Sequence, residues 1–397
     1  MSDDPIFPRF SDAEYARRYA LVRAEMDKRG LDAVVAAGDA SFRFSNHANV
    51  QWLTNWIDPY AAYAVITRDH GPFLVISNPL YLASARRAAV VDEIFGDYTP
   101  GETMGRRLLD LGLGQGRIGL AGVRNVGRAS MAYEHQRALA ETMPEATFVD
   151  ALDVMQEARR IKSAEELAWF ERGAEFTDRA AEAIAEAMHA GMPEYQLSAH
   201  IHESFLDDGG GLMFHFLGAT PMDAPELIFP WQYPSTRALR RGDVLLTEIS
   251  VGYWGHAGQL QRAYTVAAQP SAEYRKLHDM AMECYQRIFE MLKPGVTNED
   301  ILDAARFVER QGYKTLDVLF HGWGITIEPP RCDLDCAMIK RECLPFTVEA
   351  GMLFVIQPHI ITPDEQRGLQ VGNLVHVGAT ETRTLQKSSM DLFVSAS

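Results

Sequence analysis

Gly242-Asp243-Val244-Leu245-Leu246-Thr247-Glu248-Ile249 reads as a turn followed by a buried strand. Glycine and aspartate favour turns, and a short, mostly apolar run such as Val244–Ile249 is typical of a strand inside a sheet. The run contains a single acid, Glu248, and an acid inside an apolar strand requires a partner. We therefore expect a strand-rich region here, with Glu248 as a functional residue.

The sequence predicts further strands and helices on both sides of this stretch. Towards the C-terminus the pattern predicts strands near residues 259–266, 353–357 and 374–377, and helices over 272–292 and 299–311. Towards the N-terminus, Ser163 and Glu166 form a capping-box pattern that starts a helix. This element marks a junction between two expected domains, residues 1–158 and 159–397.

The N-terminal domain alternates between helical and strand patterns, which predicts an α/β architecture. Ser11 and Glu14 begin a helix that should end at Gly30. Gly114, Gly116 and Gly119 match a dinucleotide fingerprint, but the motif follows a helix and leads into a strand, so we interpret it as a turn. Further elements are expected as strands at 31–37, 61–66, 73–76 and 117–120 and a helix at 104–111.

The composition of the chain argues against several classes of function. The net charge of −16 disfavours nucleic acid as a partner, and no apolar run is long enough to span a membrane. The N-terminus does not resemble a signal peptide, so we expect a cytoplasmic protein. The acidic surface is compatible with a small-molecule substrate. Cys332, Cys336 and Cys343 could form a structural zinc site, although their spacing lacks the usual CxxC pairs and favours free thiols.

Six motifs in the same order resemble the creatinase/prolidase/methionine aminopeptidase family, M24, whose C-terminal domain has the pita-bread fold. The resemblance implies an α+β protein with a creatinase-like α/β N-terminal domain and a pita-bread catalytic domain. The motifs are Arg160–Glu166, Gly242–Glu248, Gly258–Arg262, Lys293–Gly295, His321–Gly324 and Glu349–Pro358.

In the metallopeptidase branch of that family, five acidic or histidine side chains hold two divalent cations. The corresponding positions of this chain are Glu248, Gln259, His321, Gln357 and Gly372. Amides bring no negative charge, and only Glu248 and His321 are strong ligands, so we expect no metal and no other cofactor. The resemblance to creatinase, which also lacks metals, implies hydrolysis of a C–N bond in a small carboxylate-bearing molecule, such as an amide or amidine.

The remaining polar residues suggest roles in such a reaction. We expect His321 to act as the base, with Glu248 orienting the imidazole or acting as the base itself. Arg331 would clamp a carboxylate, or pair with a nearby acid, and Trp231 would form a pocket wall. Gln259, Gln261 and Gln357 would donate hydrogen bonds, or only fill an emptied pocket; His359 and Glu328 are further candidates for substrate binding.

Two alternatives remain open from the sequence. The chain is either a ligand-binding member of the fold without catalysis, or a peptidase or lyase that uses one metal ion held by Glu248 and His321. The resemblance also implies a homodimer. Trp52, Trp56 and Tyr60 would lie on a loop at the interface, or else in the core.

Overall fold

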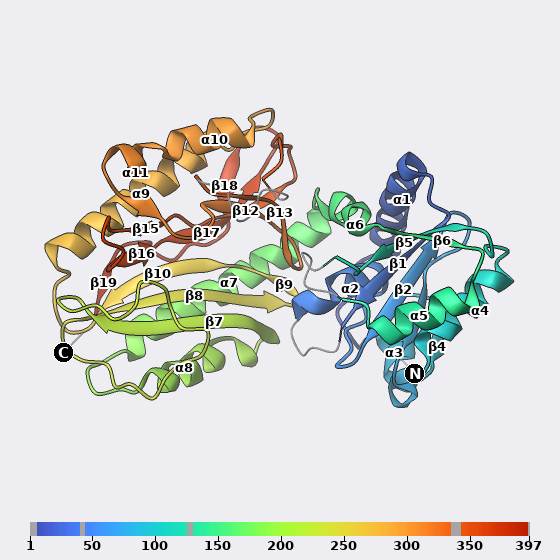
Figure 1. Cartoon of the computed structure of the whole chain (residues 1–397). Helices are drawn as coiled ribbons and strands as arrows, with labels where there is room; N and C mark the ends of the chain where they lie inside the picture. The colour runs from blue at the N-terminus through green and yellow to red at the C-terminus, as the bar shows by residue number, and fades with distance from the viewer. Residues whose placement is uncertain (1–5, 40–43, 125–129, 335–342, 396–397) are drawn as a thin grey trace. The chain divides into compact units, whose positions relative to one another are not determined.

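The computed structural model describes residues 6–39, 44–124, 130–334 and 343–395. The chain forms two compact units (Figure 1). Unit 1 comprises Met1–Arg160 with Ile325–Ile327, and unit 2 comprises Ile161–Gly324 with Glu328–Ser397. The division falls two residues after the expected boundary. The α+β class and the two-domain architecture are confirmed.

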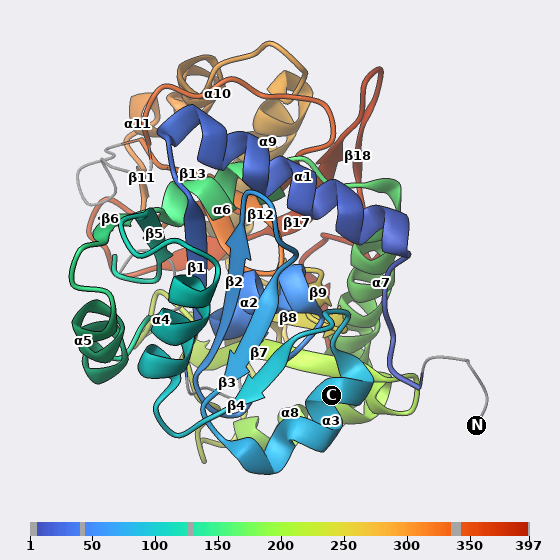
Figure 2. The same ribbon diagram turned by 90° about the vertical axis from the view of Figure 1, so that its right-hand side faces the viewer.

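Unit 1 is a mixed six-stranded sheet with helices on both faces (Figures 1 and 2). The strands, in spatial order, are β4 (Ile94–Gly96), β3 (Phe73–Ile76), β2 (Ala62–Thr67), β1 (Ala33–Gly38), β5 (Arg117–Ala121) and β6 (Thr147–Asp150). The helices are α1 (Asp12–Arg29), α2 (Ala48–Thr54), α3 (Leu82–Ala88), α4 (Pro100–Asp110), α5 (Tyr133–Thr142) and α6 (Leu152–Arg159), with the 3-10 turns η1 (Phe44–His47) and η2 (Pro79–Tyr81).

Successive side chains of a strand point to opposite faces of the sheet, so each strand contributes to the hydrophobic cluster on either face. Val34 and Ala36 of β1 pack in a cluster with residues of α1, α2, α3 and α6. Ala33 and Val35 point to the other face, where residues of α4 and α5 join their cluster. As expected, Gly114 and Gly116 belong to the connection between α4 and β5.

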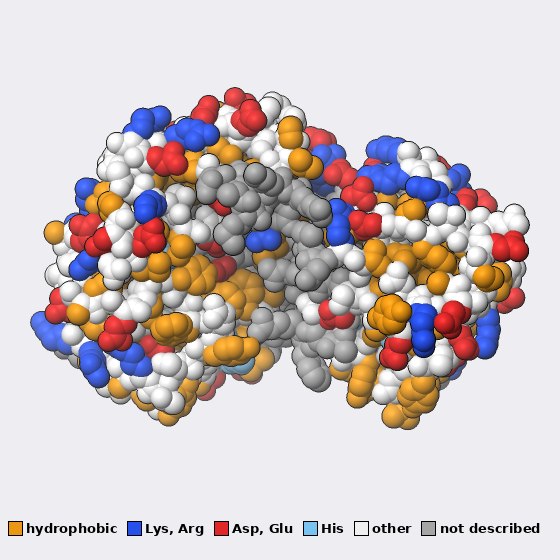
Figure 3. Space-filling view, in the orientation of Figure 1, with side chains coloured by type: hydrophobic (Ala, Val, Ile, Leu, Met, Phe, Trp, Pro, Cys, Tyr) orange, Lys and Arg blue, Asp and Glu red, His pale blue; other side chains and the backbone are white. Residues whose placement is uncertain are grey.

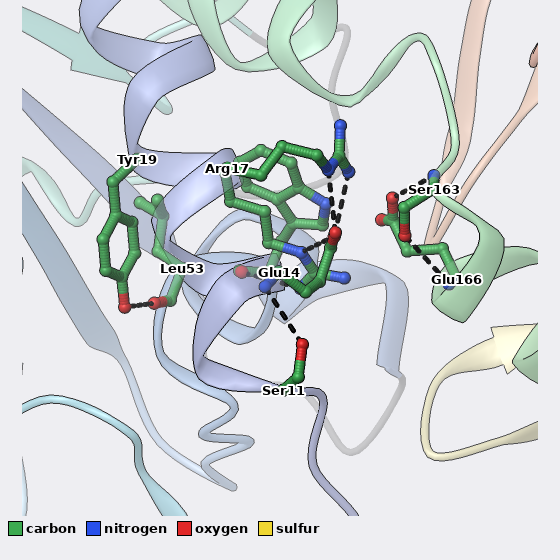
Figure 4. A network of polar contacts seen from close by, with 9 residues as sticks. Ser11, Glu14, Arg17, Tyr19, Leu53, Ser163 and Glu166 are labelled. Atoms are coloured by element: carbon green, nitrogen blue, oxygen red, sulfur yellow. Dashed lines mark hydrogen bonds and ion pairs between the residues drawn. The ribbon is translucent and has the colours of Figure 1, made fainter.

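Local caps fix the ends of several helices, as the sequence predicted (Figure 4). The Ser11 hydroxyl accepts a hydrogen bond from the Glu14 amide at 3.2 Å, and Gly30 ends α1 in the left-handed region with φ 61°. In unit 2, Ser163 and Glu166 form both hydrogen bonds of the capping box that starts α7 (Ala164–Ala187).

Two of the three aromatic residues considered for the dimer interface belong to the core of unit 1. Trp52 lies on α2 and is 1% exposed, and Trp56 is 6% exposed. Tyr60 is 44% exposed. The interface interpretation is therefore wrong for Trp52 and Trp56, because their rings fill the layer beneath α1.

Unit 2 is built on a ten-stranded sheet with helices packed against it. The main path of this sheet is β13 (Ile327–Cys332), β12 (Phe320–Trp323), β14 (Leu353–Ile356), β17 (Gly372–Val377), β10 (Leu260–Thr265), β8 (Asp243–Tyr253) and β7 (Gly210–Pro221). The short strands β9 (His256–Ala257), β18 (Thr382–Thr384) and β19 (Phe393–Val394) pair off this path, and β11 (Lys314–Thr315), β15 (His359–Ile361) and β16 (Gly368–Gln370) form a separate sheet. The helices are α7, α8 (Glu194–Leu206), α9 (Ala272–Met291), α10 (Asn298–Ala305) and α11 (Phe307–Arg310).

The helix expected over 299–311 is in fact two helices, α10 and α11, which meet at Arg306. Apolar residues on both sides of the break pack into one cluster, including Ile301, Leu302 and Val308. Apolar spacing alone therefore did not reveal the break.

Strand register separates an apolar face of the large sheet from a polar one. Ile249, Leu260, Asn373, Ile356 and Phe320 lie opposite one another in successive pairs across five strands. On the other face, Gln261 lies opposite both Glu248 and Gly372. His321 follows Phe320 on β12, so alternation places it on the same face as Gln261. We call this the inner face.

The surface carries both signs of charge. On the face shown in Figure 3, Lys and Arg side chains are interspersed with Asp and Glu side chains on each unit. Among the described residues, none of the helices is long and apolar enough to cross a membrane.

Candidate active site

A buried cluster of one carboxylate and three amides occupies the inner face. Gln259 Nε2 donates to Glu248 Oε1 at 2.7 Å and to Gln357 Oε1 at 3.0 Å. Gln261 Nε2 donates to the same Gln357 oxygen at 2.9 Å. The structure therefore brings together four of the predicted site residues, which we call the amide cluster. Glu248 lies on β8, Gln261 on β10, Gln259 directly before β10 and Gln357 directly after β14.

The amide cluster does not present the donors that were expected of it. Gln259 uses both amide hydrogens on Glu248 and Gln357, so it has none left for an oxyanion. The Oε1 atoms of Gln259 and Gln261 are buried without a hydrogen-bond partner in the described part of the chain. The expectation of a donor role is thus wrong for Gln259, which offers an acceptor instead.

The cluster continues to Asp317, a residue that the sequence did not single out. Gln357 Nε2 donates to Asp317 Oδ2 at 3.0 Å, and the Val318 amide donates to Asp317 Oδ1 at 2.7 Å. Burial raises the pKa of Asp317, and the hydrogen bond from Val318 and the charge of Arg331 oppose that shift. No motif includes Asp317; its position four residues before His321 was the only available signal.

Gly372 leaves no space for a longer side chain. A Cβ at this position would overlap Gln261 Oε1 and lie 2.5 Å from the Ile356 carbonyl oxygen. Arg262 holds the surrounding backbone, because its Nη1 donates to the carbonyl oxygens of Gly372 at 2.8 Å and of Gln261 at 3.0 Å. The Gln261 side chain therefore fills the space where a side chain at 372 would begin.

These side chains do not fit a pair of divalent cations. Within the described ranges, no group of three or more His, Cys, Asp or Glu residues is arranged to hold a metal ion. Divalent cations in two-metal sites are held chiefly by carboxylates and imidazoles, and three of the five relevant positions are occupied by Gln259, Gln357 and Gly372.

His321 lies buried on β12 with a defined tautomer. Its Nδ1 is 2.9 Å from the Gly322 carbonyl oxygen, which can only accept, so Nδ1 carries the proton of the neutral ring. The ring packs at 5.7 Å from that of Trp323, whose Nε1 donates to the Ala257 carbonyl oxygen. Nε2 of the neutral imidazole is therefore the basic atom.

His359 is also buried, on β15, with the opposite tautomer. Its Nε2 donates to the Ile228 carbonyl oxygen at 2.7 Å, and its ring stacks on Phe229 at 5.4 Å. Burial lowers the pKa of His359 to about 4. The imidazole is therefore neutral at physiological pH, and its Nδ1 has no partner in the described structure.

The buried neutral state of His359 makes stability depend on pH. The unfolded chain binds a proton at the ordinary pKa of 6.5, whereas the folded chain does so only near 4, so acidification favours unfolding. Between pH 7 and pH 4 we expect the wild type to lose about 3 kcal/mol more unfolding free energy than His359→Gln. Urea titrations at several pH values measure this difference, and parallel curves for the two proteins would contradict it. Substitution of the exposed His189 by Gln is the control.

Two other predicted residues, Glu328 and Arg331, lie on β13, each near a side chain of opposite charge. Glu328 accepts a hydrogen bond from Lys162 Nζ at 2.9 Å, and both side chains are buried. A buried pair of this kind leaves Glu328 committed to Lys162. Arg331 lies close enough to Asp317 for its charge to act on the carboxylate.

The last candidates lie outside the amide cluster. Trp231 is 45% exposed and forms an isolated bridge with Leu217, and its role as a pocket wall stays a prediction. The thiols of Cys332 and Cys343 are each 4.0 Å from Asn298 Nδ2. Cys336 lies outside the described residues.

Two protein-family models together match most of the chain. The model of metallopeptidase family M24 matches residues 168–379, and that of the creatinase/prolidase N-terminal domain matches residues 18–161. Together these matches cover both units.

Two individual relatives are distant in sequence but match most of the chain. Creatinase from Bacillus sp. (strain B-0618) is 22% identical over 389 residues, which cover 92% of this chain and 88% of creatinase. A probable dipeptidase PepE from Mycobacterium tuberculosis is 25% identical over 370 residues, covering 87% of this chain and 90% of the relative.

Solved structures share the fold. The prolidase from Pyrococcus horikoshii OT3 superposes with a TM-score of 0.77 at 20% identity, covering 94% of this chain and 99% of the prolidase. Dipeptidase PepE from Mycobacterium ulcerans gives a TM-score of 0.77 at 22% identity, covering 98% and 99%.

Proposed function

This chain belongs to metallopeptidase family M24, and from that premise we propose that it is a hydrolase that works without a metal ion. Its substrate would be a small carboxylate-bearing molecule with an amide, amidine or related C–N bond. Relatives named as creatinase and as dipeptidases support hydrolysis of a C–N bond. The non-peptide substrate and the absence of a metal are our inferences from the site.

One observation carries the proposal. The amide cluster replaces the expected ligands with neutral side chains, and Gln261 occupies the space beside Gly372 that a fifth ligand would need. A divalent cation placed there would meet Glu248 as the only carboxylate of the cluster, and the amides supply no compensating charge. The site is therefore better suited to positioning an organic substrate than to binding metal.

The chemistry rests on a base and a carboxylate that share the inner face. His321 Nε2, basic because Nδ1 is bonded to Gly322, takes a proton from the attacking water. Glu248, held by Gln259, stabilises the positive charge that develops on the imidazole or on the substrate nitrogen. Arg331 binds the substrate carboxylate. Protonation of the leaving nitrogen by His321 completes the hydrolysis.

A chelator experiment tests the proposal directly. The protein is purified in EDTA, its metal content is measured, and it is screened for turnover of small amides, amidines and ureas that bear a carboxylate, with Xaa-Pro dipeptides as a separate arm. We expect turnover of a non-peptide compound with unchanged kcat in EDTA, because no step needs a cation. Loss of activity in EDTA, restored by Mn²⁺ or Zn²⁺, would contradict the proposal, as would exclusive turnover of dipeptides.

We also propose that the chain forms a homodimer, as the family resemblance implies. Size-exclusion chromatography with light scattering would give about twice the chain mass of 44.4 kDa. A monomer at every concentration tested would contradict this.

A further inference from the structure

Asp317 is the one group in the network whose two hydrogen bonds require a carboxylate. Oδ1 accepts from the Val318 amide and Oδ2 accepts from Gln357 Nε2. An ionised carboxylate only accepts, whereas an amide has one accepting and one donating end. Gln357 must therefore turn its Nε2 towards Asp317 and its Oε1 away.

This orientation propagates through the amide cluster. Because Gln357 turns its oxygen inward, Gln259 and Gln261 must each present Nε2 to it, and they do. The second hydrogen of Gln259 Nε2 then goes to Glu248, which is again a carboxylate and only accepts. Each bond in the path from Asp317 to Glu248 thus has one permitted direction.

We propose that Asp317 is a positioning residue that sets the polarity of the amide cluster, so that the cluster offers the substrate carbonyl oxygens rather than amide hydrogens at Gln259. This inference rests on the proposed function only in taking the amide cluster as the substrate site. The buried, unpartnered Oε1 atom of Gln259 is its visible consequence, whereas Gln261 Oε1 is packed against Gly372. A substrate that donates an N–H or O–H group fits Gln259 Oε1, and one that presents only acceptors to Gln259 does not.

The surroundings of Asp317 support a charged acceptor at this place. Burial favours the neutral acid and raises its pKa, while the Val318 amide and the charge of Arg331 favour the carboxylate. A residue retained here only for packing would not need two donors and a nearby guanidinium. Burial, together with the charge of Asp333, gives Asp317 a net raised pKa. The geometry that supports an acceptor is the pair of donors, Val318 N–H and Gln357 Nε2, that point at the carboxyl group.

Asp317→Asn tests the proposal without any substrate. The oxygen of the introduced asparagine can keep the hydrogen bond from the Val318 amide. Its nitrogen then faces Gln357 Nε2, so two hydrogen-bond donors point at each other and neither has an acceptor. We expect a fall in Tm of roughly 5 °C, because a buried donor loses its partner. Neutron diffraction of deuterium-exchanged crystals should show Gln357 turned over and Gln259 no longer donating to it.

Combining Asp317→Asn with Gln357→Glu should restore the original polarity. The introduced glutamate accepts from the new asparagine with one oxygen and from Gln259 and Gln261 with the other, and the net charge is unchanged. We expect the Tm to return to within about 2 °C of wild type, with the deuterons of Gln259 again on Glu248 and on residue 357.

Asp333→Asn is the matched control, because Asp333 acts on Asp317 through its charge. It should leave the orientation of every cluster amide unchanged. The proposal is overturned if Asp317→Asn leaves the deuterons of Gln259 and Gln357 in place, or if the double variant is no more stable than Asp317→Asn. Neither result depends on turnover, so failure of the proposed hydrolysis would be seen separately in the substrate screen.

Discussion

Glu248→Gln should lower kcat/KM by about 10³-fold or more on any substrate that the screen identifies, while leaving the fold intact. Glu248 is the only carboxylate among the five positions that match metal ligands, and Gln259 Nε2 holds it at 2.7 Å. A positioned carboxylate or base contributes about 10²–10⁴-fold to such reactions. The introduced amide can still accept from Gln259 through its oxygen, so the cluster persists without the charge.

The measurement is a comparison of steady-state kinetics and urea unfolding for the two proteins. Glu194→Gln is the matched control, since Glu194 is a buried acid of the same unit whose carboxylate accepts hydrogen bonds from Ala219 and Ser235. We expect this control to lose stability but to keep kcat/KM within about tenfold of wild type. Glu248→Gln with wild-type kinetics would remove Glu248 from the mechanism. If Glu248→Gln loses both activity and folding, Glu248→Asp, which keeps the negative charge, is measured instead. Activity in a folded Glu248→Asp variant would support the role of the charge, and its absence in a folded variant would contradict it.

The parts of this molecule that were predictable are those encoded locally. The turn at Gly242 with the strand that carries Glu248, and the caps at Ser11 and Ser163, depend on residues within a few positions of one another. Such patterns identify elements, and the ordered motifs then indicate the fold. The break at Arg306 escaped prediction because apolar residues continue on both sides of it.

The sequence predicted most of the residues of the candidate site, but not which of them donate and which accept hydrogen bonds. Gln259 and Gln357 are 98 residues apart, and Gln357 and Asp317 are 40 apart, so their contact depends on how the strands and loops of unit 2 assemble. The direction of each amide then depends on the carboxylates at the ends of the path, one of which, Asp317, belongs to no motif. Donor and acceptor roles that were interchangeable in the sequence become fixed only in the assembled network.

Gly372→Ala should destabilise the protein by about 3 kcal/mol, although it adds a single methyl group. The new Cβ would overlap Gln261 Oε1 and lie 2.5 Å from the Ile356 carbonyl oxygen. The first obstacle is the end of a side chain, but the second is the backbone of a neighbouring strand that pairs with β17. Relief therefore requires β14 and β17 to separate, which disturbs the register that aligns the amide cluster.

Urea unfolding of Gly372→Ala, Gln261→Ala and the double variant divides this cost between its two sources. We expect Gln261→Ala to recover about 1 kcal/mol in the double variant, with the remainder persisting because the overlap with the Ile356 carbonyl oxygen is still present. Gly71→Ala, where nothing lies within 4 Å of the added atom, is the control for a glycine substitution without overlap. Wild-type stability of Gly372→Ala would show that the space beside Gly372 is open. A side chain at 372 would then have room, and the steric part of the argument against a metal centre would fail while the charge argument from Gln259 and Gln357 remained.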